Sequence, residues 1–203
     1  ARAAGKYPVL KGRTGPIRDM VTVAREFVGA LQHTEPAVWQ MFQPDFGDSE
    51  VTFVWDDDGL LCKARVDRIA TPSYSIVVDY KTSGLSCAPQ AVEERPSVMG
   101  WDIQAAMHER GLDALDPDNA GRRKHYYVNQ ENEPPYALTV VEISEADLTM
   151  GRKKLAVALE IWNRCVTTDI WPGYEAAGVL VPEYPGWKES QWLEREVSEF
   201  SND

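Results

Sequence analysis

Three residues that suit metal-assisted chemistry on a phosphate group lie close together in the chain, namely Asp67, Asp79 and Lys81. Asp67 ends a hairpin-like run, and Asp79 ends the apolar run 75–78. Carboxylates at the ends of neighbouring strands can converge on one Mg²⁺ or Mn²⁺ ion, because such cations prefer oxygen ligands. Strand side chains repeat with a period of two, so Lys81 projects from the same face as Asp79. There an ammonium can stabilise charge on a phosphoryl oxygen.

A second interpretation of Asp79 and Lys81 is a solvated ion pair at the end of a strand, which contributes little to stability. The apolar run before Asp79 and the second carboxylate, Asp67, weigh in favour of a metal site. On these residues alone, both interpretations stay open.

The elements that must position these residues follow from hydrophobic periodicity and from turn and cap residues. The order is helix, hairpin, strand, helix, two strands and helix, which predicts an α/β fold with a mixed sheet. The expected helices span 16–31, 36–42, 98–111 (stopped by Gly111) and 144–166 (capped by Ser144). The expected strands span 51–55 and 60–66 around a turn at 56–59, 75–78, 125–128, and 136–143 after Pro134-Pro135.

Three ordered segments carry a resemblance to a known family. They read KARVD at 63–67, VVDYKTS at 77–83 and GWDIQAAMH at 100–108. Together they resemble the PD-(D/E)XK nuclease superfamily and, within it, the RecE (exodeoxyribonuclease VIII)-type exonucleases of phages and prophages. Further matches extend the resemblance over almost the whole chain from about residue 17, namely Glu50, Trp171-Pro172-Gly173-Tyr174 and Pro185-Gly186-Trp187.

The resemblance implies a restriction-endonuclease-like core, a central mixed sheet flanked by helices, and it assigns roles by position. Asp67 and Asp79 would bind Mg²⁺ or Mn²⁺, joined by the backbone carbonyl of Tyr80. Asp79 and Lys81 would be catalytic, Lys81 as the catalytic lysine. Gln104, on the helix after the catalytic strands, would orient the active site and the DNA.

The sequence departs from the family pattern at several positions. Val66 replaces the proline of the motif, and His108 stands where the family prefers tyrosine. Relatives commonly carry a metal-binding histidine upstream, for which His33 is the candidate, although a histidine at a helix end also interacts with the helix dipole. Glu50 either faces the metal or lies on the surface, and Arg65 is expected to contact the site.

The implied activity is that of a metal-dependent 5′→3′ exodeoxyribonuclease on linear duplex DNA in phage-type recombination. The implied partners are a single-strand annealing protein and further copies of the chain, in the cytoplasm of a bacterial host and away from membranes. Two alternatives stay open. One is a repair nuclease of different substrate preference, and the other is an inactive or truncated nuclease fold that serves as a DNA-binding or assembly module.

The charge of the chain is unevenly distributed. Thirty-two acidic and 21 basic residues give a net charge of −11, which argues against indiscriminate coating of nucleic acid or anionic membrane. Basic residues nevertheless gather at 1–25, where six of them and Asp19 give a net +5, and at 122–125. These two segments predict a local basic face for the DNA backbone.

Length and composition predict one globular domain, and the resemblance implies that it is a single nuclease domain over 1–203. The start without methionine predicts that an N-terminal segment is lacking, and no run is apolar enough for a membrane span. The odd, widely spaced cysteines predict reduced thiols: Cys62, Cys87 and Cys165. Three tryptophans are expected to pack in the core: Trp55, Trp162 and Trp171.

Overall fold

The predicted hairpin and the three later strands form one mixed sheet within the described residues, so the predicted α/β class is confirmed. The strand order is β1-β2-β3-β4-β5; β3 and β4 run parallel, and the other neighbours run antiparallel. The strands are β1 (Gly47–Asp57), β2 (Leu60–Ala70), β3 (Ile76–Ser83), β4 (Lys124–Glu131) and β5 (Leu138–Glu142).

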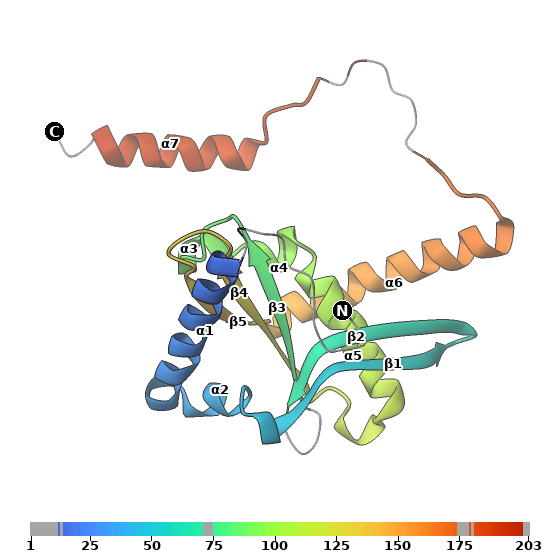
Figure 1. Cartoon of the computed structure of the whole chain (residues 1–203). Coiled ribbons are helices and arrows are strands. Elements are labelled where there is room, and N and C mark those ends of the chain that lie inside the picture. Colours follow the sequence, from blue (N-terminus) through green and yellow to red (C-terminus); the bar gives the residue numbers. More distant parts are fainter. Residues whose placement is uncertain (1–11, 13, 71–74, 174–178, 180, 201–203) are drawn as a thin grey trace. The chain divides into compact units, whose positions relative to one another are not determined.

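The computed structural model describes residues 12, 14–70, 75–173, 179 and 181–200. Contacts group the chain into two compact units, Ala1–Thr167 and Thr168–Asp203, and each is described by itself. The sheet lies in the first unit, and α7 (Gly186–Phe200), which was not predicted, lies in the second (Figure 1). A single nuclease domain over all 203 residues stays a prediction. No helix in the described ranges is long and apolar enough to cross a membrane.

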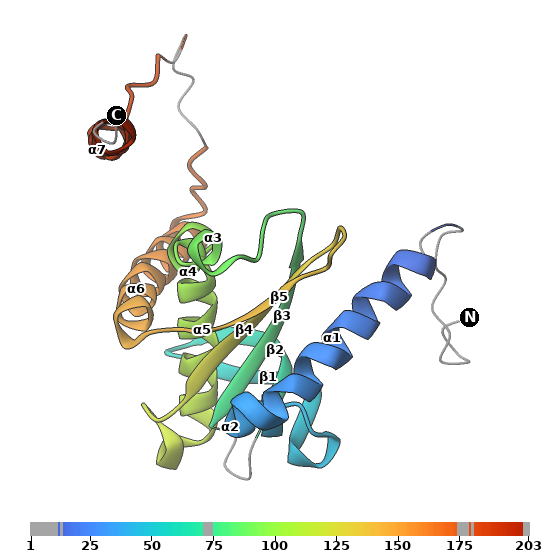
Figure 2. The same ribbon diagram turned by 90° about the vertical axis from the view of Figure 1, so that its left-hand side faces the viewer.

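Helices cover both faces of the sheet in the first unit. Figure 2 shows α1 (Thr14–Thr34) on one side, and α5 (Trp101–Leu115) and α6 (Glu145–Thr168) on the other. The remaining helical turns are short: α2 (Pro36–Gln40), α3 (Pro89–Val92), α4 (Arg95–Val98), η2 (Pro44–Phe46) and η3 (Pro117–Asn119). In this α–β–α layering the α5 and α6 side carries most of the buried helical residues, whereas Leu31 is the one buried residue of α1 among those the structure describes.

Three apolar clusters fill the space between the layers. The first packs the hairpin against the end of α5, with Phe53, Val66 and Leu112 at its centre. The second joins the start of α5 to α6 and β4. The third packs Met41 and its neighbours against the α1-facing side of the sheet. The α5 helix therefore contributes to two clusters, and its position is fixed along its whole length.

The central strand is longer than the sequence indicated. The prediction that it ends at Asp79 is wrong, because β4 pairs with β3 as far as Ser83↔Glu131. The predicted hairpin turn is confirmed but is shorter than 56–59, because Asp56 and Asp57 still pair with β2 and only 58–59 form the turn. The carboxylate of Asp56 accepts a hydrogen bond from the Gly59 amide at 2.8 Å. Asp79 and Lys81 therefore lie inside a rigid parallel strand.

Gly111 does not stop a helix, as the sequence suggested, but lies inside α5. A Cβ at this position would come within 2.7 Å of the rings of Phe53 and Trp55, so only glycine lets the helix approach the hairpin this closely. The expected burial of Trp55 is confirmed, at 4% exposed.

The expected burial of Trp162 and Trp171 is wrong. They are 50% and 54% exposed. Three of the four buried residues of α6 lie in its first half, and Trp162 lies beyond them. Trp171 belongs to the second unit. The three cysteines are free and buried, as expected.

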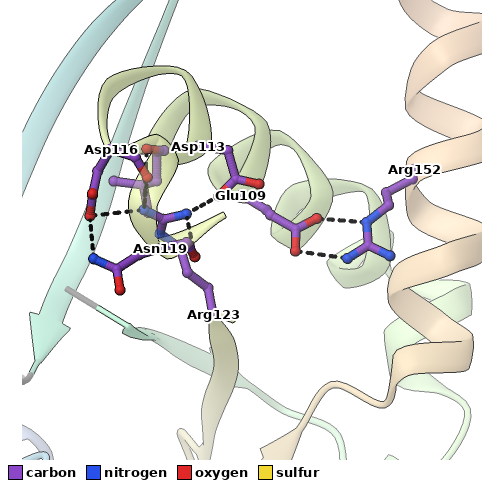
Figure 3. A network of polar contacts seen from close by, with 7 residues as sticks. Glu109, Asp113, Asp116, Asn119, Arg123 and Arg152 are labelled. Atoms are coloured by element: carbon purple, nitrogen blue, oxygen red, sulfur yellow. Dashed lines mark hydrogen bonds and ion pairs between the residues drawn. The ribbon is translucent and has the colours of Figure 1, made fainter. Parts of the chain in front are cut away.

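The α5 and α6 helices cross at a glycine and are held by ion pairs. A Cβ on Gly151 would lie 2.1 Å from the carbonyl oxygen of Asp102. The residue after Gly151, Arg152, donates to both carboxylate oxygens of Glu109 at 2.7 and 2.8 Å (Figure 3). Lys154 binds the buried carboxylate of Asp102 at 2.5 Å. Backbone contact and paired charges together fix this crossing.

We expect Gly151→Ala to lower the free energy of unfolding by about 2 kcal/mol, because the added methyl group meets rigid backbone and the helices must move apart. Chemical denaturation followed by circular dichroism measures the change. Gly29→Ala in α1 is the matched control, since a Cβ there meets nothing within 4 Å and alanine favours the helix. Equal stability of Gly151→Ala and the parent would contradict the close crossing.

Candidate active site

The site begins where β2 and β3 separate. In the described residues, these strands pair at Arg68↔Val78, Ile69↔Val77 and Ala70↔Ile76. Asp67 lies one residue beyond the last pair, and its Oδ2 accepts a hydrogen bond from the backbone N–H of Tyr80 at 2.8 Å. Beyond this point the hairpin and β3 point in different directions (Figure 1). A side-chain carboxylate thus replaces the backbone ladder at the fork.

Asp79, Lys81 and Gln104 form a closed triangle beside this fork. The Nζ of Lys81 lies 2.5 Å from Oδ1 of Asp79 and donates to Oε1 of Gln104 at 2.9 Å. The Nε2 of Gln104 donates to Oδ2 of Asp79 at 2.9 Å. Asp79 is only 5% exposed, and its carboxylate contacts Lys81 and Gln104 inside the protein.

The carboxylate of Asp79 is electrostatically frustrated. Burial raises its pKa most strongly, and the nearby charge of Asp67 raises it further. Lys81 and Gln104 act in the opposite direction, but the net shift is upward. The buried carboxylate of Asp79 and the half-buried carboxylate of Asp67 repel each other, so a cation bound between them would stabilise both charged forms.

The donor set suits a small divalent cation. Carboxylate oxygens are the ligands that Mg²⁺ takes from proteins, and one or two of them suffice because the ion keeps several waters. Within the described ranges, no group of three or more His, Cys, Asp and Glu could hold a metal ion. Asp67, Asp79 and the carbonyl of Tyr80 are the oxygen groups at the fork that could hold such a cation.

The structure brings together all five residues that the sequence singled out, although it does not test their roles. Asp67 binds the backbone of Tyr80, and Asp79, Lys81 and Gln104 contact one another. They come from β2, β3 and α5, which the hairpin core and the α5–α6 crossing hold in place.

His108 lies one helical turn after Gln104 but is buried, at 4% exposed. Its ring meets the edge of Phe53 with centroids 6.5 Å apart. Burial, and then the charge of Lys81, lower its pKa to about 4. The neutral ring is part of the core beneath the site.

The structure does not bring His33 to the carboxylates. His33 is exposed in the last turn of α1. A cavity of about 280 Å³ between α1 and the sheet reaches Asp67 and Tyr80, and α1 lines it with Ala24 and Val28. The helix therefore presents apolar side chains to Asp67.

Glu50 and Arg65 pair with each other at 3.2 Å, and both side chains are 63% exposed. The strand pairs on either side, Ser49↔Arg68 and Val51↔Val66, place Glu50 across from Asp67. The backbone of Glu50 is left-handed there, with φ 58°. Arg65 contacts Glu50, so the expected contact of Arg65 with the site carboxylate is not the one observed.

The basic run 122–125 does not form a free phosphate-binding surface. The side chain of Arg123 is fully buried and pairs with Asp113 and Asp116 below α5 (Figure 3). Lys124 pairs with Glu142 at 2.9 Å. The expectation of a basic face is therefore wrong for these two residues, because acidic neighbours neutralise them. Residues 1–11 and 13 of the other basic segment lie outside the described residues.

Sequence reasoning missed the contribution of β4. Tyr127 lies beneath the ammonium of Lys81, 5.6 Å from Nζ to the ring centroid, and stacks on Trp101. On the opposite face, Gln130 accepts from the hydroxyl of Tyr80 and donates to the carbonyl of Met20 in α1 at 3.0 Å. The signal in the sequence is a polar pair, 129–130, at the end of an aromatic strand.

Comparison with known proteins supports the fold. No protein-family model matches the chain, and no curated protein matches it. The chain is similar to the crystal structure of a candidate exonuclease from Eubacterium rectale, with 14% identity and a TM-score of 0.52, over 83% of this chain. It spans 65% of the length of that protein. The structure of SSO0001 is also similar, at 15% identity over 79% of this chain and 76% of that one, with a TM-score of only 0.35.

We expect His108→Phe to change the pH dependence of stability. In the parent, the pKa of His108 falls from 6.5 to about 4 on folding, so stability is lost as the pH falls from 6.5 to 4. The loss is about 3 kcal/mol, and it stops below pH 4. The variant has no histidine to protonate at this position. Its free energy of unfolding therefore rises relative to that of the parent as the pH falls from 6.5 to 4.

Urea unfolding at a series of pH values measures the difference. His33→Phe, on the exposed last turn of α1, is the matched control. Parallel curves for the parent and His108→Phe would contradict the burial of a neutral ring beneath the site.

Proposed function

We propose that the protein is a Mg²⁺- or Mn²⁺-dependent deoxyribonuclease of the PD-(D/E)XK type. The observation that carries the proposal is the closed contact of Asp79, Lys81 and Gln104 beside Asp67, at the fork between β2 and β3. Two buried or half-buried carboxylates, one ammonium and one amide are the groups that phosphodiester hydrolysis on a metal requires.

Each side chain then has a defined task. Asp67 and Asp79, with the carbonyl of Tyr80, would hold the metal, which supplies Lewis acidity to the phosphate. Lys81 would stabilise the charge that develops on the phosphoryl oxygens, because its ammonium projects from the same strand face as Asp79. Gln104 binds both Asp79 and Lys81 and so orients the two groups.

The proposed substrate is the end of linear duplex DNA, degraded 5′→3′ in phage-type recombination. The sequence resemblance to RecE-type exonucleases is the basis for this substrate and polarity, whereas the fold shared with a protein named as a candidate exonuclease supports only the nuclease class. A single-strand annealing protein and further copies of the chain are the proposed partners, in the cytoplasm of a bacterial host.

We expect purified protein with Mg²⁺ to degrade linear duplex DNA and to leave a covalently closed circle of the same sequence intact. Lys81→Ala should reduce the rate about 100-fold or more, because one preorganised charge at the reacting phosphate is lost. Duplexes labelled at the 5′ or the 3′ end and run on denaturing gels measure rate and polarity together.

Lys153→Ala is the matched control, since Lys153 is exposed on α6 and belongs to no part of the site. Degradation of the circle would favour a repair nuclease of different preference. An intact linear duplex, or a Lys81→Ala protein as active as the parent, would contradict the proposal and favour a binding or assembly module.

A further inference from the structure

One buried amide next to the site has no hydrogen-bond partner. Asn129 in β4 is 1% exposed, and both Nδ2 and Oδ1 lack a partner among the described residues. Its neighbour Gln130 is fully buried as well, but its amide nitrogen donates to the carbonyls of Met20 and Tyr136. An unsatisfied buried amide costs stability, so a charged group that moved within reach of Asn129 would find a hydrogen-bond partner there.

The strand register places Asn129 beside Lys81. The parallel β3–β4 ladder pairs Lys81 with Asn129 and Asp79 with Tyr127. The Lys81 ammonium lies over the ring of Tyr127, so Tyr127 and Lys81 share one face of the sheet. Asn129 is two residues after Tyr127 and therefore projects from that same face. His125, which is also buried with both ring nitrogens unpartnered, pairs instead with Val77 and not with Asp79 or Lys81.

The ammonium of Lys81 occupies the side of the Asp79 carboxylate on which a divalent cation would bind. Its Nζ lies 2.5 Å from Oδ1 of Asp79, one of the two carboxylates that suit a divalent ion. An ammonium and a divalent cation repel each other, and burial strengthens that repulsion. Gln104 offers Lys81 one acceptor, at 2.9 Å. A second acceptor must replace Asp79 if the ammonium is to stay in the site.

We propose that Asn129 is a positioning residue whose carboxamide oxygen accepts the ammonium of Lys81 when a divalent cation occupies Asp67 and Asp79. The inference rests on the proposed function and adds to it a residue outside the motifs. The amide has no partner in the metal-free protein because its partner, Lys81, is held by Asp79. Asn129 thus lowers the electrostatic penalty that Lys81 imposes on the cation.

The test is a double-mutant cycle on metal affinity, without DNA. Mn²⁺ alone is titrated by calorimetry into the parent, Asn129→Leu, Lys81→Met and the double variant. Asn129→Leu should weaken Mn²⁺ binding about tenfold, the effect of one hydrogen bond to a charged donor. In the Lys81→Met background the same substitution should change the affinity less than twofold, because no ammonium remains to be relocated.

Thermal unfolding of the metal-free proteins gives a second readout. Leucine has nearly the shape of asparagine, so Asn129→Leu should unfold at the same or a higher temperature than the parent. Gln130→Met, the matched change at the adjacent satisfied amide, should unfold at a lower temperature. Asn129→Ala repeats the cycle if leucine prevents folding.

The outcomes separate the possibilities. Equal loss of Mn²⁺ affinity in both backgrounds would overturn the proposal, because Asn129 would then act on the cation or on the fold directly. No loss of Mn²⁺ affinity in the background that retains Lys81 would overturn it too, and so would a folded Asn129→Leu protein that unfolds at a lower temperature than the parent. A parent that binds no Mn²⁺ would instead overturn the metal-dependent function itself, whereas binding without the predicted coupling would leave that function standing.

Discussion

The hydrogen bond from the Tyr80 amide to Asp67 is the contact on which the rest of the site depends. Two antiparallel strands normally continue their ladder until one of them ends. Here the ladder stops after Arg68↔Val78, and a carboxylate accepts the next backbone donor. The strands can therefore separate without leaving an unsatisfied amide. The same contact holds one acidic group next to the strand that carries Asp79 and Lys81.

A third element must supply a polar side chain that contacts the charged residues beside the fork. The α5 helix does so with Gln104, and two glycines control its placement. Gly111 lets the end of α5 approach the hairpin. Gly151 of α6 lets the backbone of α6 pack directly against the backbone of α5 at Asp102, near the start of α5. Tight backbone packing on both sides keeps Gln104 within hydrogen-bond distance of both Asp79 and Lys81. Such packing is the usual means of holding charged groups in a fixed geometry.

The sequence predicted which candidate residues lie together better than it predicted their surroundings. Local alternation was enough to place Asp79 and Lys81 on one face. The end of the predicted hairpin pointed to Asp67, and only the resemblance to a known family pointed to Gln104. The relation of Asn129 to Lys81 depends on a parallel pairing across more than 40 residues, which periodicity does not encode. Gly111 has the same local signature as a helix stop, and only its contact with Phe53 and Trp55 reveals its role. Charge runs misled for a similar reason, since the acids that neutralise Arg123 come from α5 and the turn after it.

The β3 strand contacts the helices on both sides of the sheet in the first unit. Alternation places Asp79 and Lys81 under α5 and turns the intervening Tyr80 toward α1, where its hydroxyl reaches Gln130 and, through it, the carbonyl of Met20. The backbone segment between the two charged residues is thereby fastened to a helix on the opposite side of the sheet. Any movement of α1 away from the sheet must therefore break a hydrogen bond in the chain that links Met20, Gln130 and Tyr80.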